Sequence, residues 1–189
     1  PDSELSRVNR EAAQRPVKVS AEFFDVIAQG QEYAAQSAGC FSLQLAPLVK
    51  LWEACVAANR LPDEYEVISA RRLADASLIG LDRSEHSIRF AAPGVELDCS
   101  GLVKGYAADS ALESLQRAGC KCAIVNAGTS SIAVIGANPG GRFAVRDPRD
   151  DQHAIGVITL MDRALATSGT AERQFDIVSR QLSHLIDPR

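Results

Sequence analysis

The sequence predicts an α+β fold, with helices concentrated before residue 76 and strands dominating after residue 120. Apolar residues recur at helical spacing in the early part of the chain. Later, short apolar or alternating runs are separated by turn residues, which is typical of strands. A doubly wound nucleotide-binding fold is not expected, because helices and strands do not alternate regularly and no G-x-G-x-x-G follows a strand.

Two early helices have recognisable ends. Ser20 is suited to cap a helix over 21–37, and Gly39 is suited to end it. A second helix is expected over 64–75, where Asp63 and the glutamate three residues later form a capping box.

A third helix is expected to start after Ser100 and to stop at Gly119. Pro47 is expected to block a continuous helix in the apolar stretch 41–52, because proline lacks the backbone N–H that a helix interior needs. The other apolar runs are predicted to be strands. These are residues 78–81, 87–90, 95–97, 122–126, 132–135, 143–146, 155–160, 164–167 and 182–186.

Composition bounds the class of protein. The chain has 189 residues, of which 46% are hydrophobic, and this is enough for one good core or two small ones. A net charge of -4 argues against a nucleic-acid partner, which would favour a basic surface. No apolar run approaches the length of a membrane span. The odd number of cysteines lacks zinc spacing, so we expect buried apolar thiols and a reducing compartment; they are Cys40, Cys55, Cys99, Cys120 and Cys122.

The most informative segment is 97–109, which reads as a strand end, a tight turn and a helix start. A helix N-terminus presents unpaired N–H groups and a positive dipole end, which favour a phosphate. Lys104 lies one turn into this helix, and Asp98 and Asp109 lie on either side of it. This mixture of charges predicts a phosphorylated ligand held together with a divalent cation.

Three further segments carry candidate functional groups: a small-residue turn at 126–131, a Thr-Ser-Gly turn at 167–169, and the final segment 183–189. His184 in that last segment lies within a predicted strand. A lone histidine flanked by apolar residues is usually structural, but the nearby Asp187 could orient it as a general base. Both interpretations stay open.

Taken in order, these motifs resemble the ApbE family of flavin transferases, the FAD:protein FMN transferases formerly described as thiamine-biosynthesis lipoproteins. Asp98 to Asp109 is similar to the family's Asp-Leu-Gly-Gly-Ile-Ala-Lys-Gly-Tyr-Ala-x-Asp. The other matching segments are 2–9, 46–52, 125–128, 167–169 and 184–188. The resemblance spans the whole chain.

The resemblance implies a single T-fold-type domain over 1–189, in which helices pack on a mixed or antiparallel sheet. It also implies magnesium-dependent transfer of the FMN moiety of FAD to a threonine hydroxyl of a partner protein through a phosphoester bond, with release of AMP. The partner would be a subunit of a respiratory or electron-transfer flavoprotein. The expected location is the periplasmic face of the bacterial inner membrane, with a cytoplasmic location as the alternative.

Individual roles follow from the same resemblance. His184 is expected to activate the acceptor hydroxyl, and Gly101 to offer its backbone carbonyl to magnesium. The residues expected to contact the flavin nucleotide are Asp98, Lys104, Cys40, Phe41, Ser42 and Ile186.

Departures from the family pattern keep alternatives open. Residues 42–44 are Ser-Leu-Gln where the family has Asp-Pro-Thr, and 127–129 are Ala-Gly-Thr where it has Gly-Gly-Asp. Residues 170–173 lack the usual aromatic. The alternatives are an FAD pyrophosphatase, a non-catalytic flavin-binding protein and a plain structural domain. Because the family continues beyond Arg189, we expect a portion of a longer protein whose other magnesium ligands lie further along.

Overall fold

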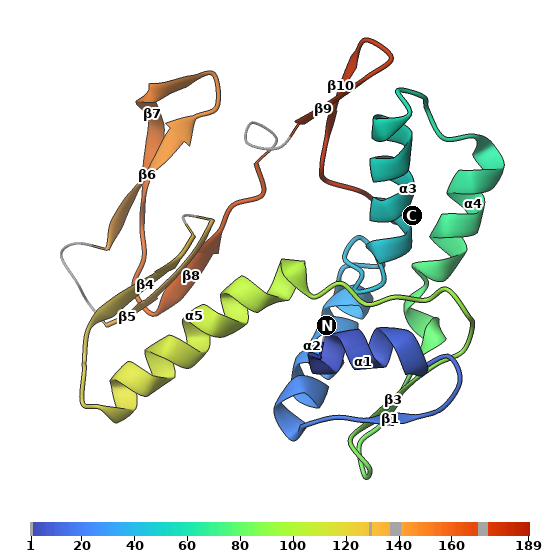
Figure 1. Cartoon of the computed structure of the whole chain (residues 1–189). Helices are drawn as coiled ribbons and strands as arrows, with labels where there is room; N and C mark the ends of the chain where they lie inside the picture. Colours follow the sequence, from blue (N-terminus) through green and yellow to red (C-terminus); the bar gives the residue numbers. More distant parts are fainter. Residues whose placement is uncertain (1, 129, 137–140, 170–173) are drawn as a thin grey trace. The chain divides into compact units, whose positions relative to one another are not determined.

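A computed structural model describes residues 2–128, 130–136, 141–169 and 174–189 (Figure 1). The chain divides into two compact units. The first unit comprises 1–101 together with 174–189, and the second comprises 102–173. Both helices and antiparallel sheets are present, so the α+β prediction is confirmed.

The first unit is mainly helical. Its helices are α1 (Glu4–Glu11), α2 (Ala21–Gln36), α3 (Ala46–Ala57), α4 (Glu64–Leu73) and the short 3-10 helix at Ala76–Leu78. Its strands are β1 (Val17–Lys18), β2 (Ile79–Asp82), β3 (Ser87–Phe90), β9 (Gln174–Ile177) and β10 (Arg180–Ser183). The first three form an antiparallel sheet in the order β1-β3-β2, and β9 and β10 form a separate hairpin.

The predicted caps of α2 and α4 are confirmed. The Ser20 hydroxyl accepts a hydrogen bond from the N–H of Phe23. Asp63 and Glu66 form the full capping box, because each side chain accepts a hydrogen bond from the backbone N–H of the other. These bonds satisfy N–H groups that would otherwise be unpaired at a helix start.

No continuous helix spans 41–52, as expected, but a helix that was not predicted begins beside Pro47. Helix α3 begins at Ala46, so the proline lies in its first turn. At that position the missing N–H has no intrahelical partner to lose, and the fixed φ angle of proline suits a helix start.

The core of the first unit gathers around α2 and the neighbouring sheet. Phe24, Ile27, Ile88 and Phe90 are almost completely buried. A second cluster joins α3 to α4, with Leu48 at its centre. The hairpin β9–β10 belongs to this unit, since the N–H of Val178 in its turn donates a hydrogen bond to Asn59 Oδ1.

The second unit is a helix packed on a small sheet. Helix α5 (Ser100–Arg117) starts in the first unit and runs through the second. The strands are β4 (Ala123–Ala127), β5 (Ser131–Ile135), β6 (Arg142–Asp147), β7 (Asp150–Thr159) and β8 (Arg163–Ala166). Three of these strands form an antiparallel sheet in the order β4-β5-β8, and β6 and β7 form a separate antiparallel pair. Ala108 and Leu112 of α5 pack against Ala133 of β5.

Most predicted strands are confirmed within one or two residues, although β7 begins five residues before its predicted start. Two expectations need correction. Residues 95–97 do not form a strand, because the backbone of Leu97 bonds to a side chain from α1. The last strand ends at Ser183, so His184 follows the strand and does not lie within it.

Cysteine burial also differs from the expectation. Cys55 is buried and Cys99 is half-buried, whereas Cys40, Cys120 and Cys122 are exposed. None of these five cysteines, all of which lie among the described residues, forms a disulfide. In the part of the chain that the structure describes, no helix is both long and apolar enough to cross a membrane.

The capping box generates a first prediction. Asp63→Ala should lower the free energy of unfolding by about 1 kcal/mol, because it removes the acceptor for an N–H in the first turn of α4. Urea denaturation followed by circular dichroism measures this. Asp63→Ser keeps a capping oxygen and should retain most of the stability. Equal losses in the two variants would show that the cap is not the cause.

Glu66 generates a second prediction, on pH. The hydrogen bonds from the Arg60 guanidinium and the Asp63 N–H lower the pKa of Glu66 from 4.5 to about 2. A carboxyl group with a lower pKa in the folded state stabilises the fold above its unfolded pKa, and this contribution is lost as the pH falls toward the folded pKa.

The difference in unfolding free energy between the natural protein and Glu66→Gln should therefore be largest above pH 4.5 and shrink toward pH 2. Glu53→Gln, at an exposed glutamate of α3, is the matched control. A Glu66→Gln difference that stayed constant across this pH range would contradict the assignment.

Candidate functional site

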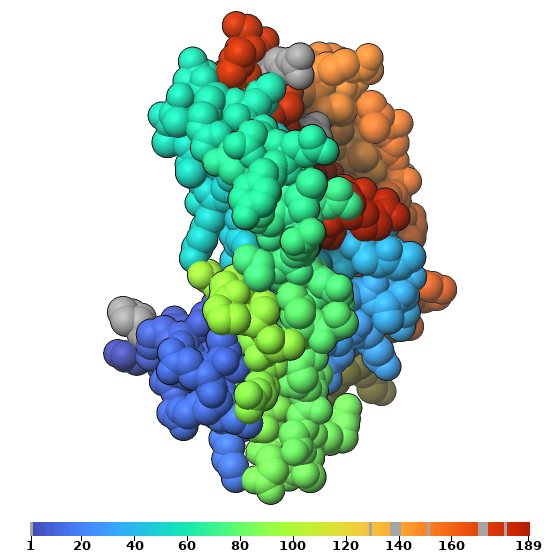
Figure 2. Space-filling view, turned by 90° about the vertical axis from the view of Figure 1, so that its right-hand side faces the viewer, coloured from blue at the N-terminus to red at the C-terminus, as the bar shows by residue number. Residues whose placement is uncertain are grey.

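The segment 95–101, which leads into α5, is held from two directions. Asn9 of α1 donates from Nδ2 to the carbonyl of Leu97 (3.0 Å) and accepts from the N–H of Leu97 at Oδ1 (2.8 Å). The N–H of Asp98 donates to the carbonyl of Leu43 (2.6 Å). Figure 2 shows the yellow-green atoms of this segment against the blue atoms of α1. Asp98 is thus fixed by residues distant in the sequence.

The side chain of Asp98 shapes the start of α5. Its Oδ1 accepts a hydrogen bond from the N–H of Ser100 (2.8 Å), so the carboxylate caps the turn from which the helix begins. The neighbouring Cys99 is half-buried, and this burial raises the pKa of its thiol to about 11. This shift disfavours the thiolate, which is the nucleophilic form of cysteine.

Gly101 lies close to one of the predicted flavin contacts. A Cβ atom at Gly101 would lie 3.3 Å from a ring carbon of Phe41, a tight contact that favours glycine at this position. The Phe41 ring packs edge-on against Tyr33 at a centroid distance of 6.4 Å. The first turn of α5 is thereby placed beside an aromatic ring.

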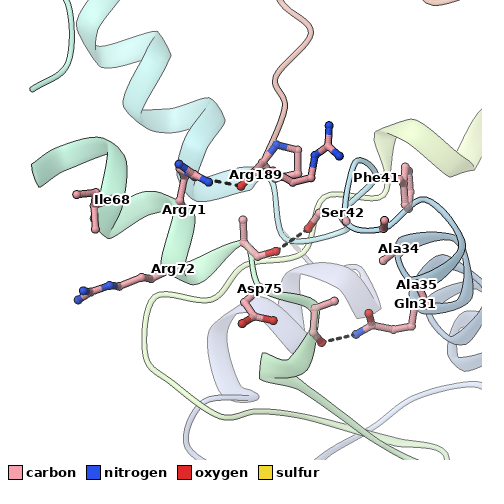
Figure 3. Close-up of a pocket in the computed structure, with 15 residues that line it drawn as sticks. Gln31, Ala34, Ala35, Phe41, Ser42, Ile68, Arg71, Arg72, Asp75 and Arg189 are labelled. Carbon is pink, nitrogen blue, oxygen red and sulfur yellow. Dashed lines mark hydrogen bonds between the residues drawn. The ribbon is translucent and has the colours of Figure 1, made fainter. Parts of the chain in front are cut away.

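Phe41 and Ser42 also line a pocket of about 630 Å³ that lies within the first unit (Figure 3). Arg71, Arg72, Arg189 and Asp75 are among the lining residues; the guanidinium of Arg189 is paired with the carboxylate of Asp187, and that of Arg71 donates to the carbonyl of Pro188. Its other walls are mostly small or apolar; they include Ala34, Ala35, Ala38, Ile68, Ala74 and Pro188. Small and apolar walls beside arginine side chains suit a ligand that combines a flat ring with an anionic group.

The hydroxyl of Ser42 is used within the protein. Its Oγ lies 2.9 Å from Gln44 Oε1 and 2.9 Å from the carbonyl of Ala74, and it accepts a hydrogen bond from the N–H of Gln44. One hydroxyl hydrogen cannot serve two acceptors. The Nε2 atom of Gln44 is buried, with no hydrogen-bond partner among the described residues. Turning the Gln44 amide, so that Nε2 donates to Ser42 and Ser42 donates to Ala74, satisfies the hydroxyl.

A separate constellation lies in the second unit. The ammonium of Lys104 donates to Ser130 Oγ over 2.9 Å. The carbonyl of Ser130 accepts from the N–H of Thr167 over 2.8 Å. The segments 98–109, 126–131 and 167–169, predicted separately from the sequence, therefore contact one another through one residue. Thr129 and residues 170–173, where the sequence departs from the family, lie outside the described residues.

His184 and Ile186 lie in the final segment of the first unit. His184 is half-buried directly after β10. Asp187, which the sequence suggested as its orienting group, is bound by Arg189 at 2.9 Å, and hydrogen bonds from Arg189 lower the pKa of Asp187 to about 2. Ile186 packs against the cluster around Leu48. Because the side chain of Ile186 is used in this packing, we expect any contact of Ile186 with a ligand to come from its backbone.

The described structure joins some predicted site residues and not others. Within the first unit, Asp98 and Gly101 lie against the chain segment that contains Phe41 and Ser42. Cys40 is exposed and does not line the pocket. Sequence reasoning missed the arginines of the pocket, Asn9 and Ser130. The last two lay inside motifs that were recognised, but their partners are distant in the sequence.

The described residues offer few candidate ligands for a magnesium ion. Among the described residues, no group of three histidine, cysteine or acidic side chains is placed to hold a metal ion. Gly101 offers only a backbone carbonyl, and one oxygen of Asp98 already caps α5.

The fold is of the α+β type, with a pocket lined partly by arginines in the first unit and a lysine hydrogen-bonded to a serine in the second. Comparison with known proteins identifies its family: the ApbE family model matches residues 1–189, and the chain belongs to the ApbE family. The resemblance drawn from the motifs is confirmed.

Several relatives carry names that state an activity. The chain is 30% identical over 189 residues to the FAD:protein FMN transferase of Klebsiella pneumoniae, covering 100% of this chain and 58% of that protein. The ApbE protein of Thermotoga maritima has a similar structure, with a TM-score of 0.86 and 27% identity over 98% of this chain and 61% of its own. The flavinyl transferase ApbE of Pseudomonas stutzeri, in its apo form, matches with a TM-score of 0.80 and 26% identity over 99% of this chain and 58% of its own. The chain thus spans about three fifths of these proteins.

The hydrogen bonds between the Asn9 side chain and the backbone of Leu97, next to Asp98, generate a third prediction. Asn9→Ala leaves both backbone groups of Leu97 without their partner, so the free energy of unfolding should fall by about 1–3 kcal/mol. Urea denaturation checks this. Gln36→Ala removes an amide from an exposed position at the end of α2 and is the matched control. If Asn9→Ala lowered the free energy of unfolding no more than the control does, the proposed role of the Asn9–Leu97 hydrogen bonds would be refuted.

Proposed function

We propose that this chain is part of an FAD:protein FMN transferase, which moves the FMN moiety of FAD to a threonine hydroxyl of a partner protein in a magnesium-dependent reaction. The observation that carries this proposal is the start of α5, where Asp98 caps the turn and Lys104 follows one helical turn later with its ammonium tethered. The names of the relatives support transfer of FMN from FAD to a protein.

The charges suit a dinucleotide whose two phosphates must be neutralised. The N–H groups at the start of α5 and the ammonium of Lys104 are donors suited to phosphate oxygens. The pocket beside Phe41 offers an aromatic surface and the guanidinium of Arg71. Arginine stacks on flat rings and binds phosphate through paired N–H groups. A pocket with an aromatic surface and a guanidinium group is typical of sites for ring-bearing phosphate esters.

The proposed transfer balances as a substitution at phosphorus. The threonine hydroxyl oxygen of the acceptor forms a bond to the FMN phosphorus of FAD, and the bond from that phosphorus to the bridging oxygen breaks. AMP leaves with the bridging oxygen. His184 takes the hydroxyl proton as general base. Donors such as Lys104 oppose the negative charge on the phosphates during the step. A bound magnesium ion would supply further charge neutralisation.

Partner and location follow from the same proposal. The acceptor would be a subunit of a respiratory or electron-transfer flavoprotein, as the resemblance to the family implies. We propose the periplasmic face of the bacterial inner membrane as the site of action, with the cytoplasm as the alternative. Fractionation of cells that express the tagged protein distinguishes the two.

The test incubates the full-length protein with FAD, magnesium and a threonine-bearing acceptor domain. In-gel flavin fluorescence of the acceptor and release of AMP are measured together, and an acceptor with threonine replaced by valine is the control. Fluorescence of the threonine acceptor alone, with matching AMP, is the expected result. AMP without labelled acceptor would indicate an FAD pyrophosphatase. FAD binding without AMP would indicate a non-catalytic flavin-binding protein.

His184 generates a fourth prediction. His184→Ala should lower the rate of AMP release in this assay by about 100-fold or more, because a general base contributes at least that factor. His153→Ala is the matched control, since His153 is an exposed histidine of β7 whose partner is Asp150. Normal transfer by His184→Ala would remove this residue from its proposed role.

A further inference from the structure

We propose that Ser130 is a positioning residue that holds the ammonium of Lys104 in place for a ligand phosphate. This inference rests on the proposed function, because it assigns to Lys104 a contact with the phosphates of FAD. Ser130 lies in the turn between β4 and β5, 26 residues from Lys104 along the chain.

The side chain of Lys104 needs such a tether. Lys104 is exposed on α5, and a lysine has a long side chain with many rotamers that must be restricted before it can bind. The hydrogen bond of 2.9 Å from its Nζ to Ser130 Oγ selects among those rotamers before a ligand arrives. Preorganisation of this kind raises affinity by lowering the entropic cost of binding.

Ser130 is itself held firmly. Its carbonyl accepts the N–H of Thr167 over 2.8 Å, and the next residue, Ser131, pairs with Ala166 in the β5–β8 ladder. The turn before it contains Gly128, whose φ of 68° is in the left-handed region that favours glycine. The hydroxyl that receives the lysine is therefore anchored to the sheet that α5 packs against.

The chemistry of the tether suits a lysine that must still bind an anion. A serine hydroxyl carries no charge, so the positive charge of Lys104 is not neutralised by its partner. An ammonium has three N–H donors, and the bond to Ser130 uses only one of them. A carboxylate in the place of Ser130 would hold the lysine equally well but would compete with the phosphate. The same turn leaves room for the ammonium, since a Cβ at Gly128 would be 3.9 Å from Nζ.

The inference predicts a particular change in kinetics. Removal of the hydroxyl leaves the charge of Lys104 in place but frees its position, so affinity for FAD should fall while the chemical step is spared. For Ser130→Ala we expect the KM for FAD in AMP release to rise about fivefold, with kcat within about twofold of the natural value. Partial misfolding would instead lower kcat and leave KM unchanged, because fewer molecules would be active.

The experiment uses the full-length protein and five variants: Ser130→Ala, Ser130→Thr, Ser114→Ala, Lys104→Met and the double variant that combines Lys104→Met with Ser130→Ala. Ser130→Thr keeps the hydroxyl and should restore the natural KM. Ser114→Ala removes a hydroxyl whose bond to the Ser110 carbonyl lies further along α5, and should leave KM unchanged. In the Lys104→Met background, Ser130→Ala should produce no further rise in KM, because the tether has nothing left to position.

The outcomes separate this inference from the function on which it rests. If the natural protein neither binds FAD nor releases AMP, the proposed function fails and this inference fails with it. If the natural protein is active but Ser130→Ala has the natural KM, the inference alone is overturned. A rise in KM that persists in the Lys104→Met background, or that Ser130→Thr does not rescue, would likewise overturn it.

Discussion

The pairing of the Asn9 side chain with the backbone of Leu97 is the constraint on which the candidate site depends. Both polar groups of Leu97 are bound by one amide, and Val95 and Leu97 point into the core. The next residue, Asp98, is then fixed by the carbonyl of Leu43, and its carboxylate starts α5. Because a side chain with one donor and one acceptor matches both backbone groups, the segment can be buried without joining a sheet. The orientation of the first helical turn follows from this pairing.

Local signals explain why much of the fold could be predicted from the sequence. A cap such as the one Asp63 provides depends on residues within one helical turn, so the sequence alone reveals it. The segment 95–97 misled for the opposite reason, since its hydrogen-bond partner Asn9 is 88 residues away. Pro47 did not reveal that α3 begins beside it, because proline is compatible with the first turn of a helix as well as with a segment that is not helical. Two-residue strands such as β1 carry almost no periodic signal.

The candidate site, like the fold, was predictable where it depends on neighbouring residues and not where it depends on distant contacts. The charged residues of 98–109 were predicted from the chemistry of a helix start, and the resemblance to the ApbE family added a flavin nucleotide as ligand. Contacts made by side chains were not predictable. The hydroxyl of Ser42 lies 2.9 Å from the Ala74 carbonyl, and Asp187 is paired with Arg189, contacts that the sequence did not reveal. The tether between Lys104 and Ser130 required the packing of α5 on its sheet.

The central claim is that the start of α5 and the tethered ammonium of Lys104 hold the phosphates of FAD. A crystal structure of the full-length protein with FAD bound tests this claim most directly. The account predicts a phosphate oxygen within hydrogen-bond distance of Lys104 Nζ, with the lysine still bonded to Ser130, and the dinucleotide phosphates at the N-terminal turn of α5. FAD phosphates bound away from both Lys104 and this turn would contradict it.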